Sequence, residues 1–68
     1  MIKKRVIHMV PVKIGDLVEL HGFSGDIFFG IVLHKDSEGI NVVFHDGDTQ
    51  WYLYDELEDE RMYILEVS

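Results

Sequence analysis

The chain contains no cysteine, and its 68 residues include only one proline and six basic residues. Without cysteine it can form neither a disulfide framework nor a thiolate metal site, so no covalent link holds so small a core together. Its longest apolar runs fall well short of the ~18 residues that a membrane span requires, and the N-terminus lacks the apolar segment and cleavage site of a secretory signal. We therefore expect a single unprocessed, soluble, cytoplasmic domain over residues 1–68 that has no membrane partner.

Basic residues are scarce and unevenly placed. Thirteen acidic residues give a formal charge of −7, and Lys3, Lys4 and Arg5 supply half of the positive charge. Residues 6–68 carry three basic residues against all 13 acidic ones, a formal charge of −10. A surface of this sign repels a phosphate backbone, so the net charge disfavours RNA as a partner. The basic start is most simply a solvated terminus, with an RNA-binding arm as the alternative.

Catalytic and metal-binding motifs are also missing. The chain has no glycine-rich phosphate loop, and its serines and Thr49 fall in predicted turns or at the terminus, with no base predicted beside them. We expect neither an enzyme nor a cofactor. The four histidines are His8, His21, His34 and His45. The predicted hairpin places His34 opposite Asn41 and His45 opposite Gly30, too far apart for a zinc site, so we expect no metal.

Short apolar segments alternate with turn residues, which is typical of an all-β domain. Residues 40–57 predict a strand, a tight Asp46-Gly47 turn, a second strand and a closing turn, the second half of a small closed barrel. Strand 27–35 is apolar on both faces and should bend at Gly30. One 3₁₀ turn at 55–58 should place Leu57 in the end of the barrel. The predicted strands are 5–10 at a sheet edge, ended by Pro11, then 17–21, 27–35, 40–45, 50–54 and 62–67.

Turn residues and core positions recur at a defined spacing: Lys13-x-Gly15-Asp16-x-Val18, Gly30-x-Val32, Val42-x-Phe44-x-Asp46-Gly47 and Leu57. This spacing resembles that of SH3-like small barrels, above all Tudor-type modules, over residues 12–67. The resemblance implies five to six strongly bent antiparallel strands. A weaker resemblance, in architecture alone, is to Sm-like RNA-binding barrels, which form rings by pairing edge strands. The chain lacks their RNA-contact residues in its central strands and the arginine-glycine pair before the last hairpin strand.

Aromatic residues provide the candidate site. The candidates are Phe28, Phe44, Trp51, Tyr52 and Tyr54, with Asp46 and Asp48 beside them. Tudor-type modules hold methylated lysine or arginine in cages of such rings, so the resemblance implies a cage, and Phe44 and Asp46 match it most clearly. The alternative is that these rings are core residues. Because Trp51 and Tyr52 point to opposite faces of a strand, at least one of them should be exposed or in an interface.

Two hypotheses follow. The first is a non-enzymatic module that binds a protein or basic peptide through exposed aromatic residues and acidic turns. The second is an Sm-like oligomeric RNA-binding protein that uses Lys3, Lys4 and Arg5. Both predict a homo-oligomer that forms through edge strands, because unpaired edges at 5–10 and 62–67 would favour pairing between chains.

Overall fold

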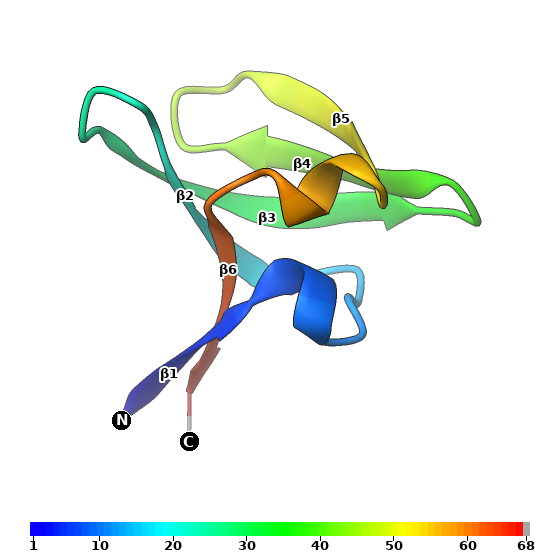
Figure 1. Ribbon diagram of the computed structural model, residues 1–68, viewed down its shortest axis with the longest axis horizontal. Helices are drawn as coiled ribbons and strands as arrows, with labels where there is room; N and C mark the ends of the chain where they lie inside the picture. The colour runs from blue at the N-terminus through cyan, green and yellow to red at the C-terminus, as the bar shows by residue number, and fades with distance from the viewer. Residues whose placement is uncertain (68) are drawn as a thin grey trace.

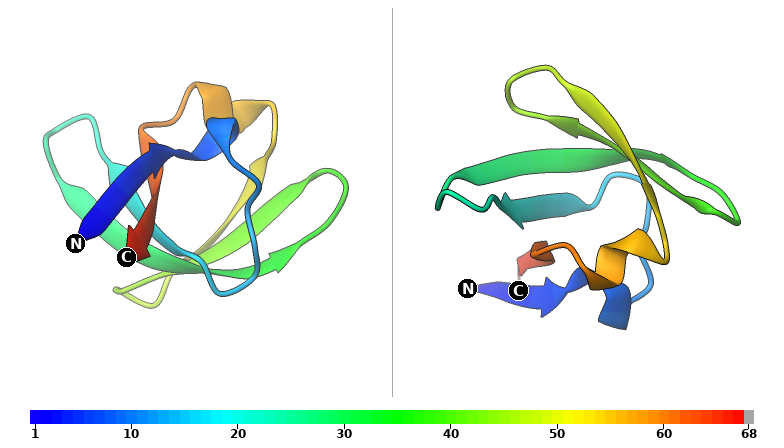
Figure 2. Two further views of the ribbon diagram at one scale, coloured as in Figure 1. Left: turned by 90° about the horizontal axis from the view of Figure 1, so that it is seen from below. Right: turned by 45° about the horizontal axis from the view of Figure 1, so that its top comes forward.

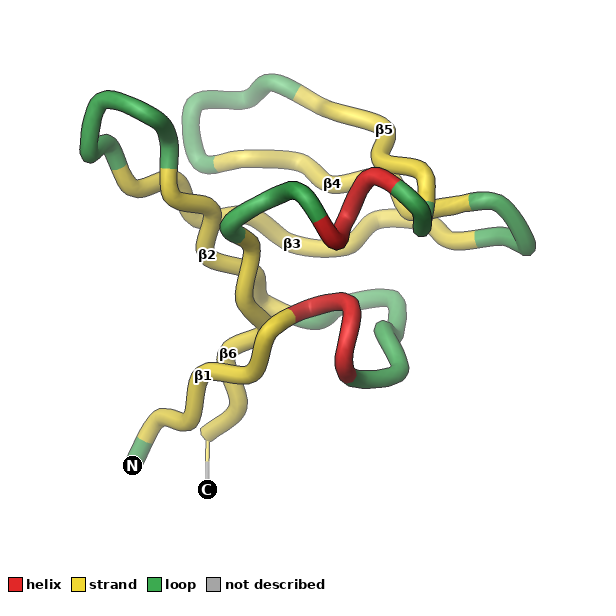
Figure 3. The backbone as a smooth tube through the Cα atoms, in the orientation of Figure 1, coloured by secondary structure: helices red, strands yellow, loops and turns green. Residues whose placement is uncertain are grey.

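The computed structural model describes residues 1–67 and confirms an all-β fold. Its strands follow the apolar segments of the sequence, and three of them, β2, β3 and β6, have the predicted bounds (Figures 1 and 3). The strands are β1 (Ile2–Val6), β2 (Leu17–His21), β3 (Ile27–Lys35), β4 (Gly39–Phe44), β5 (Thr49–Leu53) and β6 (Met62–Val67). Two 3₁₀ turns, η1 (Ile7–Met9) and η2 (Glu56–Glu58), complete the fold, one more than predicted. Across residues 1–67 no helix has the length and apolar character needed to cross a bilayer.

The six strands form one antiparallel sheet in the order β1-β6-β2-β3-β4-β5. The sheet curls around the core, but its end strands β1 and β5 do not pair with each other, so the predicted closed barrel is wrong in this respect. Figure 2 shows η1 and η2 side by side at this open seam, where each follows one of the end strands. Ile7 from η1 and Leu57 from η2 fill the seam with side chains that are almost fully buried.

The core lies on the concave face of the sheet. β3 alternates as the period of a strand requires: Phe28, Gly30 and Val32 point inward, and the residues between them point outward. Gly30 pairs with Phe44 of β4, so a glycine lies where the large ring needs room. The buried apolar residues are Ile7, Val12, Val18, Val32, Ile40, Val42, Phe44, Leu57, Met62 and Ile64. The predicted core positions of Phe44 and Leu57 are confirmed.

The N-terminus differs from its prediction. The strand expected at 5–10 lies instead at Ile2–Val6, and the chain turns into η1 at Ile7. Lys3, Lys4 and Arg5 are therefore residues of a strand paired with β6, and all three remain exposed to solvent. The physical reason is the pairing with β6: a strand at Ile2–Val6 pairs with β6 along its whole length, and the turn that follows buries Ile7 in the core. The edge position that we predicted for the first strand is confirmed, because β1 ends the sheet. The unpaired edge predicted at 62–67 is wrong, because β6 lies between β1 and β2 and pairs with both.

The β3–β4 hairpin has the predicted register near its turn, where His34 pairs with Asn41 and Lys35 with Ile40. A bulge between Val32 and His34 then shifts the register. As a result the backbone N–H of His45 donates to the carbonyl of Phe29 at 2.8 Å. The prediction that His45 lies opposite Gly30 is therefore wrong by one residue.

Candidate aromatic binding site

Three of the predicted aromatic residues meet at one end of the concave face. Phe28, Phe44 and Tyr52 come from the adjacent strands β3, β4 and β5. The ring centroids of Phe28 and Phe44 are 6.4 Å apart with the planes at 73°, and those of Phe44 and Tyr52 are 6.5 Å apart at 84°. Both pairs have the edge-to-face geometry that aromatic quadrupoles favour. Phe44 is thus the buried centre of a row whose outer members are only partly buried.

Gly30 and His45 hold these rings in place. A Cβ atom at Gly30 would lie 2.7 Å from Cγ1 of Val42 and 2.9 Å from Cδ1 of Phe44, so a side chain there would push the Phe44 ring aside. On the other side, the His45 ring stacks against Phe28 with centroids 6.1 Å apart and planes at 22°. The histidine is fixed in turn by its Nδ1, which accepts the backbone N–H of Phe29 at 3.2 Å. The ring row is therefore preorganised by its neighbours.

The rings line an open cavity of about 210 Å³. Asp46 and Asp48, from the β4–β5 turn, lie at the same cavity, and both residues are exposed. Asp46 Oδ1 accepts the backbone N–H of Asp48 at 3.0 Å, and this bond keeps the turn in shape. Gly47, with φ of 93°, supplies the left-handed residue that the turn requires. The cavity therefore combines aromatic walls with two carboxylates.

The charges that act on Tyr52 are negative, as are those of Asp46 and Asp48 at the rim of the cavity. Burial raises the pKa of the Tyr52 hydroxyl above its usual value, and the charges of Glu60 and Glu56 raise it further. Because these two carboxylates add to Asp46 and Asp48, the cavity lies in a negative potential that attracts cations.

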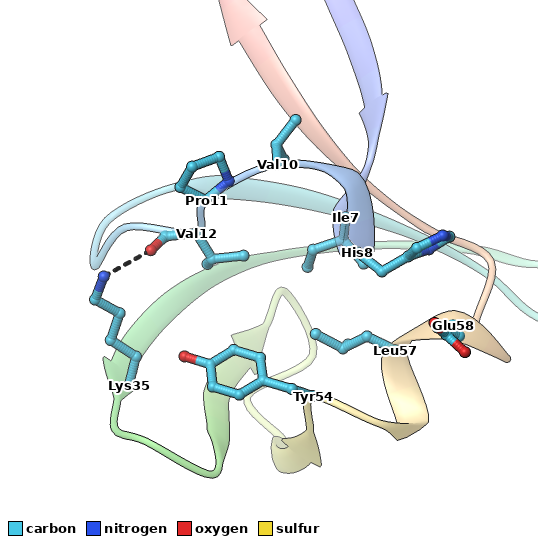
Figure 4. A pocket seen from close by; sticks show the side chains of 9 residues that line it. All are labelled: Ile7, His8, Val10, Pro11, Val12, Lys35, Tyr54, Leu57 and Glu58. Atoms are coloured by element: carbon cyan, nitrogen blue, oxygen red, sulfur yellow. Dashed lines mark hydrogen bonds between the residues drawn. The ribbon is translucent and has the colours of Figure 1, made fainter.

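The structure separates two predicted aromatic residues from this site. Trp51 neighbours Tyr52 on β5 and so points to the opposite, convex face, where it is 42% exposed. Tyr54 follows the end of β5 and lines a different cavity of about 340 Å³ near the C-terminal end of β3 (Figure 4). There Lys35 Nζ donates to the carbonyl of Val12 at 2.9 Å, and Tyr54 and Leu57 both line the cavity. That cavity has a cationic group at its wall, unlike the aromatic site.

The residues proposed for RNA contact lie elsewhere, on β1. Lys4 Nζ is 2.8 Å from Glu19 Oε2, and Arg5 Nε is 3.4 Å from Glu66 Oε2. Two of the three basic side chains are thus engaged in ion pairs with this chain's own carboxylates. Among residues 1–67 no three histidine, aspartate or glutamate side chains gather in a group that could hold a metal ion.

Two lining residues of the aromatic cavity, Leu20 and Gln50, were not among the candidates. Leu20 pairs directly with Phe28, and Gln50 with Val42, so each points to the concave face beside the rings. Period-two alternation in 17–21 and 50–54 would have placed them on that face if the strand pairing had been known. No protein-family model, curated protein sequence or solved structure matches this chain.

Proposed function

We propose that this chain is a non-enzymatic binding module of the SH3-like, Tudor-type kind, which takes a cationic side chain of a basic protein or peptide into the aromatic cavity. The observation that carries the proposal is the meeting of Phe28, Phe44 and Tyr52 with Asp46 and Asp48 at one cavity. Ring faces attract an ammonium or guanidinium group, and a nearby carboxylate strengthens that attraction. The peptide backbone then lies along the acidic β4–β5 turn.

The size and charge of the cavity support this ligand class. A volume of about 210 Å³ is enough for one side-chain head group and is smaller than the roughly 300–1,000 Å³ of typical sites for drug-sized ligands. The carboxylates make an anion or a nucleotide phosphate a poor fit, whereas they favour lysine, arginine and their methylated forms. Trp51 lies on the other face and takes no part in this contact.

The test is a titration with four peptides of equal length that differ at one central residue: lysine, trimethyllysine, dimethylarginine and neutral acetyllysine. We expect at least one cationic peptide to bind, with amide chemical-shift changes at Tyr52, Asp46 and Asp48, and the acetyllysine peptide to bind much more weakly. The Trp51 indole should not shift. Equal binding of the neutral peptide, or shifts confined to Trp51, would contradict the proposal.

Two variants test the cavity itself. Phe28→Leu removes one ring but keeps an apolar side chain, and we expect about a threefold to thirtyfold loss of affinity, because a cation–π contact contributes about 0.5–2 kcal/mol. Asp48→Asn should weaken binding about threefold to tenfold by removing a carboxylate at the rim. Asp36→Asn, the matched control, makes the same charge change at an exposed position in the β3–β4 turn, at the other end of these strands from the cavity. If Asp36→Asn weakens binding as much as Asp48→Asn does, net charge and not the cavity governs affinity.

A further inference from the structure

The convex face of the sheet carries an exposed apolar surface, which we call the outer stripe. It consists of Leu17, Ile27, Phe29, Ile31, Leu33 and Trp51, each 39–49% exposed. Four of these residues are at alternate positions of β3, which is why they share one face. The stripe runs from β2 to β5: Leu17 pairs with Ile31, and Ile31 pairs with the partly buried Val43 of β4. Trp51 of β5 pairs with Asn41, also of β4. Leu17, Phe29, Ile31 and Val43 also line one shallow depression of about 230 Å³.

Acidic residues are scarce on this surface although the chain carries a charge of −7. Glu19 lies beside it as the cross-strand partner of Phe29, but its carboxylate is buried. Eleven of the 13 acidic residues lie outside the strands, and β3, β4 and β5 contain none. The two that do lie in strands are ion-paired within the chain: Glu19 with Lys4 at 2.8 Å, and Glu66 with Arg5 at 3.4 Å. The negative charge is thus concentrated in the turns that join the strands (Figure 3), and the outer stripe is apolar and close to neutral.

We propose that a second copy of this chain covers the outer stripe, in a twofold dimer in which the convex faces of the two β3 strands pack against each other. In a twofold contact the same patch must complement itself. Two surfaces rich in carboxylates would repel each other, whereas an apolar, nearly neutral stripe can face its own copy without burying like charges. A large exposed apolar patch bordered by polar groups is also typical of an interaction surface.

The exposed area sets the expected strength. Large apolar side chains present on the order of 150–250 Å² each when fully exposed, so these six leave about 500 Å² open on each copy. Stable interfaces bury roughly 800 Å² per partner, and smaller ones are weak or transient. We therefore expect a dissociation constant on the order of 10–100 µM. Because each copy carries a charge of −7, screening by salt should strengthen the dimer.

This arrangement differs from the oligomer through edge strands predicted from the sequence. Packing of convex faces leaves the edges β1 and β5 unpaired between chains, and it leaves the aromatic cavity on the concave face open. A charge placed in the outer stripe would therefore abolish a face-packed dimer and leave an edge-paired one intact. The proposal does not depend on the function proposed for the cavity.

Sedimentation velocity from about 5 µM to about 1 mM protein, in about 0.05 and 0.5 M NaCl, tests the proposal. We expect wild type to pass from monomer to dimer, at lower concentrations in high salt. Ile31→Glu should remain monomeric throughout. Phe23→Glu, the matched control, adds the same charge to a fully exposed apolar residue at the tip of the β2–β3 loop and should dimerise as wild type does.

A milder variant, Leu33→Ser, provides the same test if Ile31→Glu does not fold. Leu33 lies at the β3 bulge and is half exposed, so we expect this change to leave the fold intact. It should retain the wild-type circular dichroism spectrum and raise the dissociation constant at least threefold. The proposal is overturned if wild type is monomeric at all concentrations in both salts, in which case another partner or solvent covers the stripe. It is also overturned if folded Ile31→Glu or Leu33→Ser dimerises as tightly as Phe23→Glu.

Discussion

Glu19 is the only charged residue buried in the part of the chain that the structure describes. Its Oε2 atom accepts hydrogen bonds from Lys4 Nζ and His21 Nε2, both at 2.8 Å. The bonds from Lys4 and then from His21 lower the pKa of this carboxyl, and burial opposes them in part. Since the pKa is depressed in the folded state, the ionised carboxylate stabilises the fold above the unfolded-state pKa. That contribution is lost as pH falls through the folded value.

We therefore predict that Glu19→Gln lowers the free energy of unfolding by about 1–2 kcal/mol at neutral pH, because it leaves Lys4 without its carboxylate. The difference from wild type should shrink as pH falls below about 4.3, the usual pKa of a glutamate, and toward the lower pKa of the folded-state carboxyl. Urea unfolding at several pH values between about 7 and 3 measures this effect. Glu66→Gln is the control: its pair with Arg5 is half exposed and should contribute less than about 0.5 kcal/mol. A difference for Glu19→Gln that stayed constant over this pH range would contradict the assignment.

At the scale of the element, β3 is the strand on which both surfaces depend. Gly30→Ala would place a Cβ atom 2.7 Å from both Cγ1 of Val42 and the carbonyl oxygen of Val43, and the latter is backbone that cannot easily move. We predict a loss of about 1–3 kcal/mol in the free energy of unfolding. The control is Gly22→Ala, whose Cβ atom would meet its nearest neighbour at an ordinary 3.5 Å. Equal effects of the two changes in urea unfolding would show that Gly30 is not needed for close packing.

The elements that could be predicted from sequence are those with a local pattern. β3 and β6 each begin with an apolar run, and the Asp46-Gly47 turn has its own residue signature, so the sequence locates all three. β1 was misplaced because its pairing with β6 joins residues about 60 apart in the chain, and no local pattern shows such a contact. The apolar run that suggested a strand at 5–10 instead supplies Ile7 to the core.

The same distinction applies to the candidate site. Alternation along β5 predicts that Trp51 and Tyr52 point apart, as they do. Which of them joins Phe28 and Phe44 depends on the register between β4 and β5, where Ile40 pairs with Tyr52. The β3 bulge also shifts the register between β3 and β4, and no single residue of the sequence indicates this bulge. Ring identities could be read from the sequence, but their meeting at one cavity required the strand pairing.

For the whole molecule, stability depends on how the open seam between β1 and β5 is filled. Leu57 of η2 is 2% exposed and packs there with Ile7 of η1. Because β1 and β5 form no hydrogen-bonded ladder with each other, this side-chain packing closes the seam between them. A domain of this size has a total stability of about 3–10 kcal/mol. Removing a buried leucine side chain costs about 2–5 kcal/mol, a large share of that total.

We predict that Leu57→Ala is largely unfolded, or unfolds at a much lower urea concentration than wild type, with all probes changing together because the core is continuous across the seam. Leu53→Ala is the matched control, since Leu53 lies on β5 with its side chain 40% exposed and should cost less than about 1 kcal/mol. Circular dichroism and Trp51 fluorescence, followed in the same urea titration, measure both variants. If Leu57→Ala and Leu53→Ala unfold at the same urea concentration, the fold does not depend on the packing of Leu57 in the seam, and the prediction is wrong.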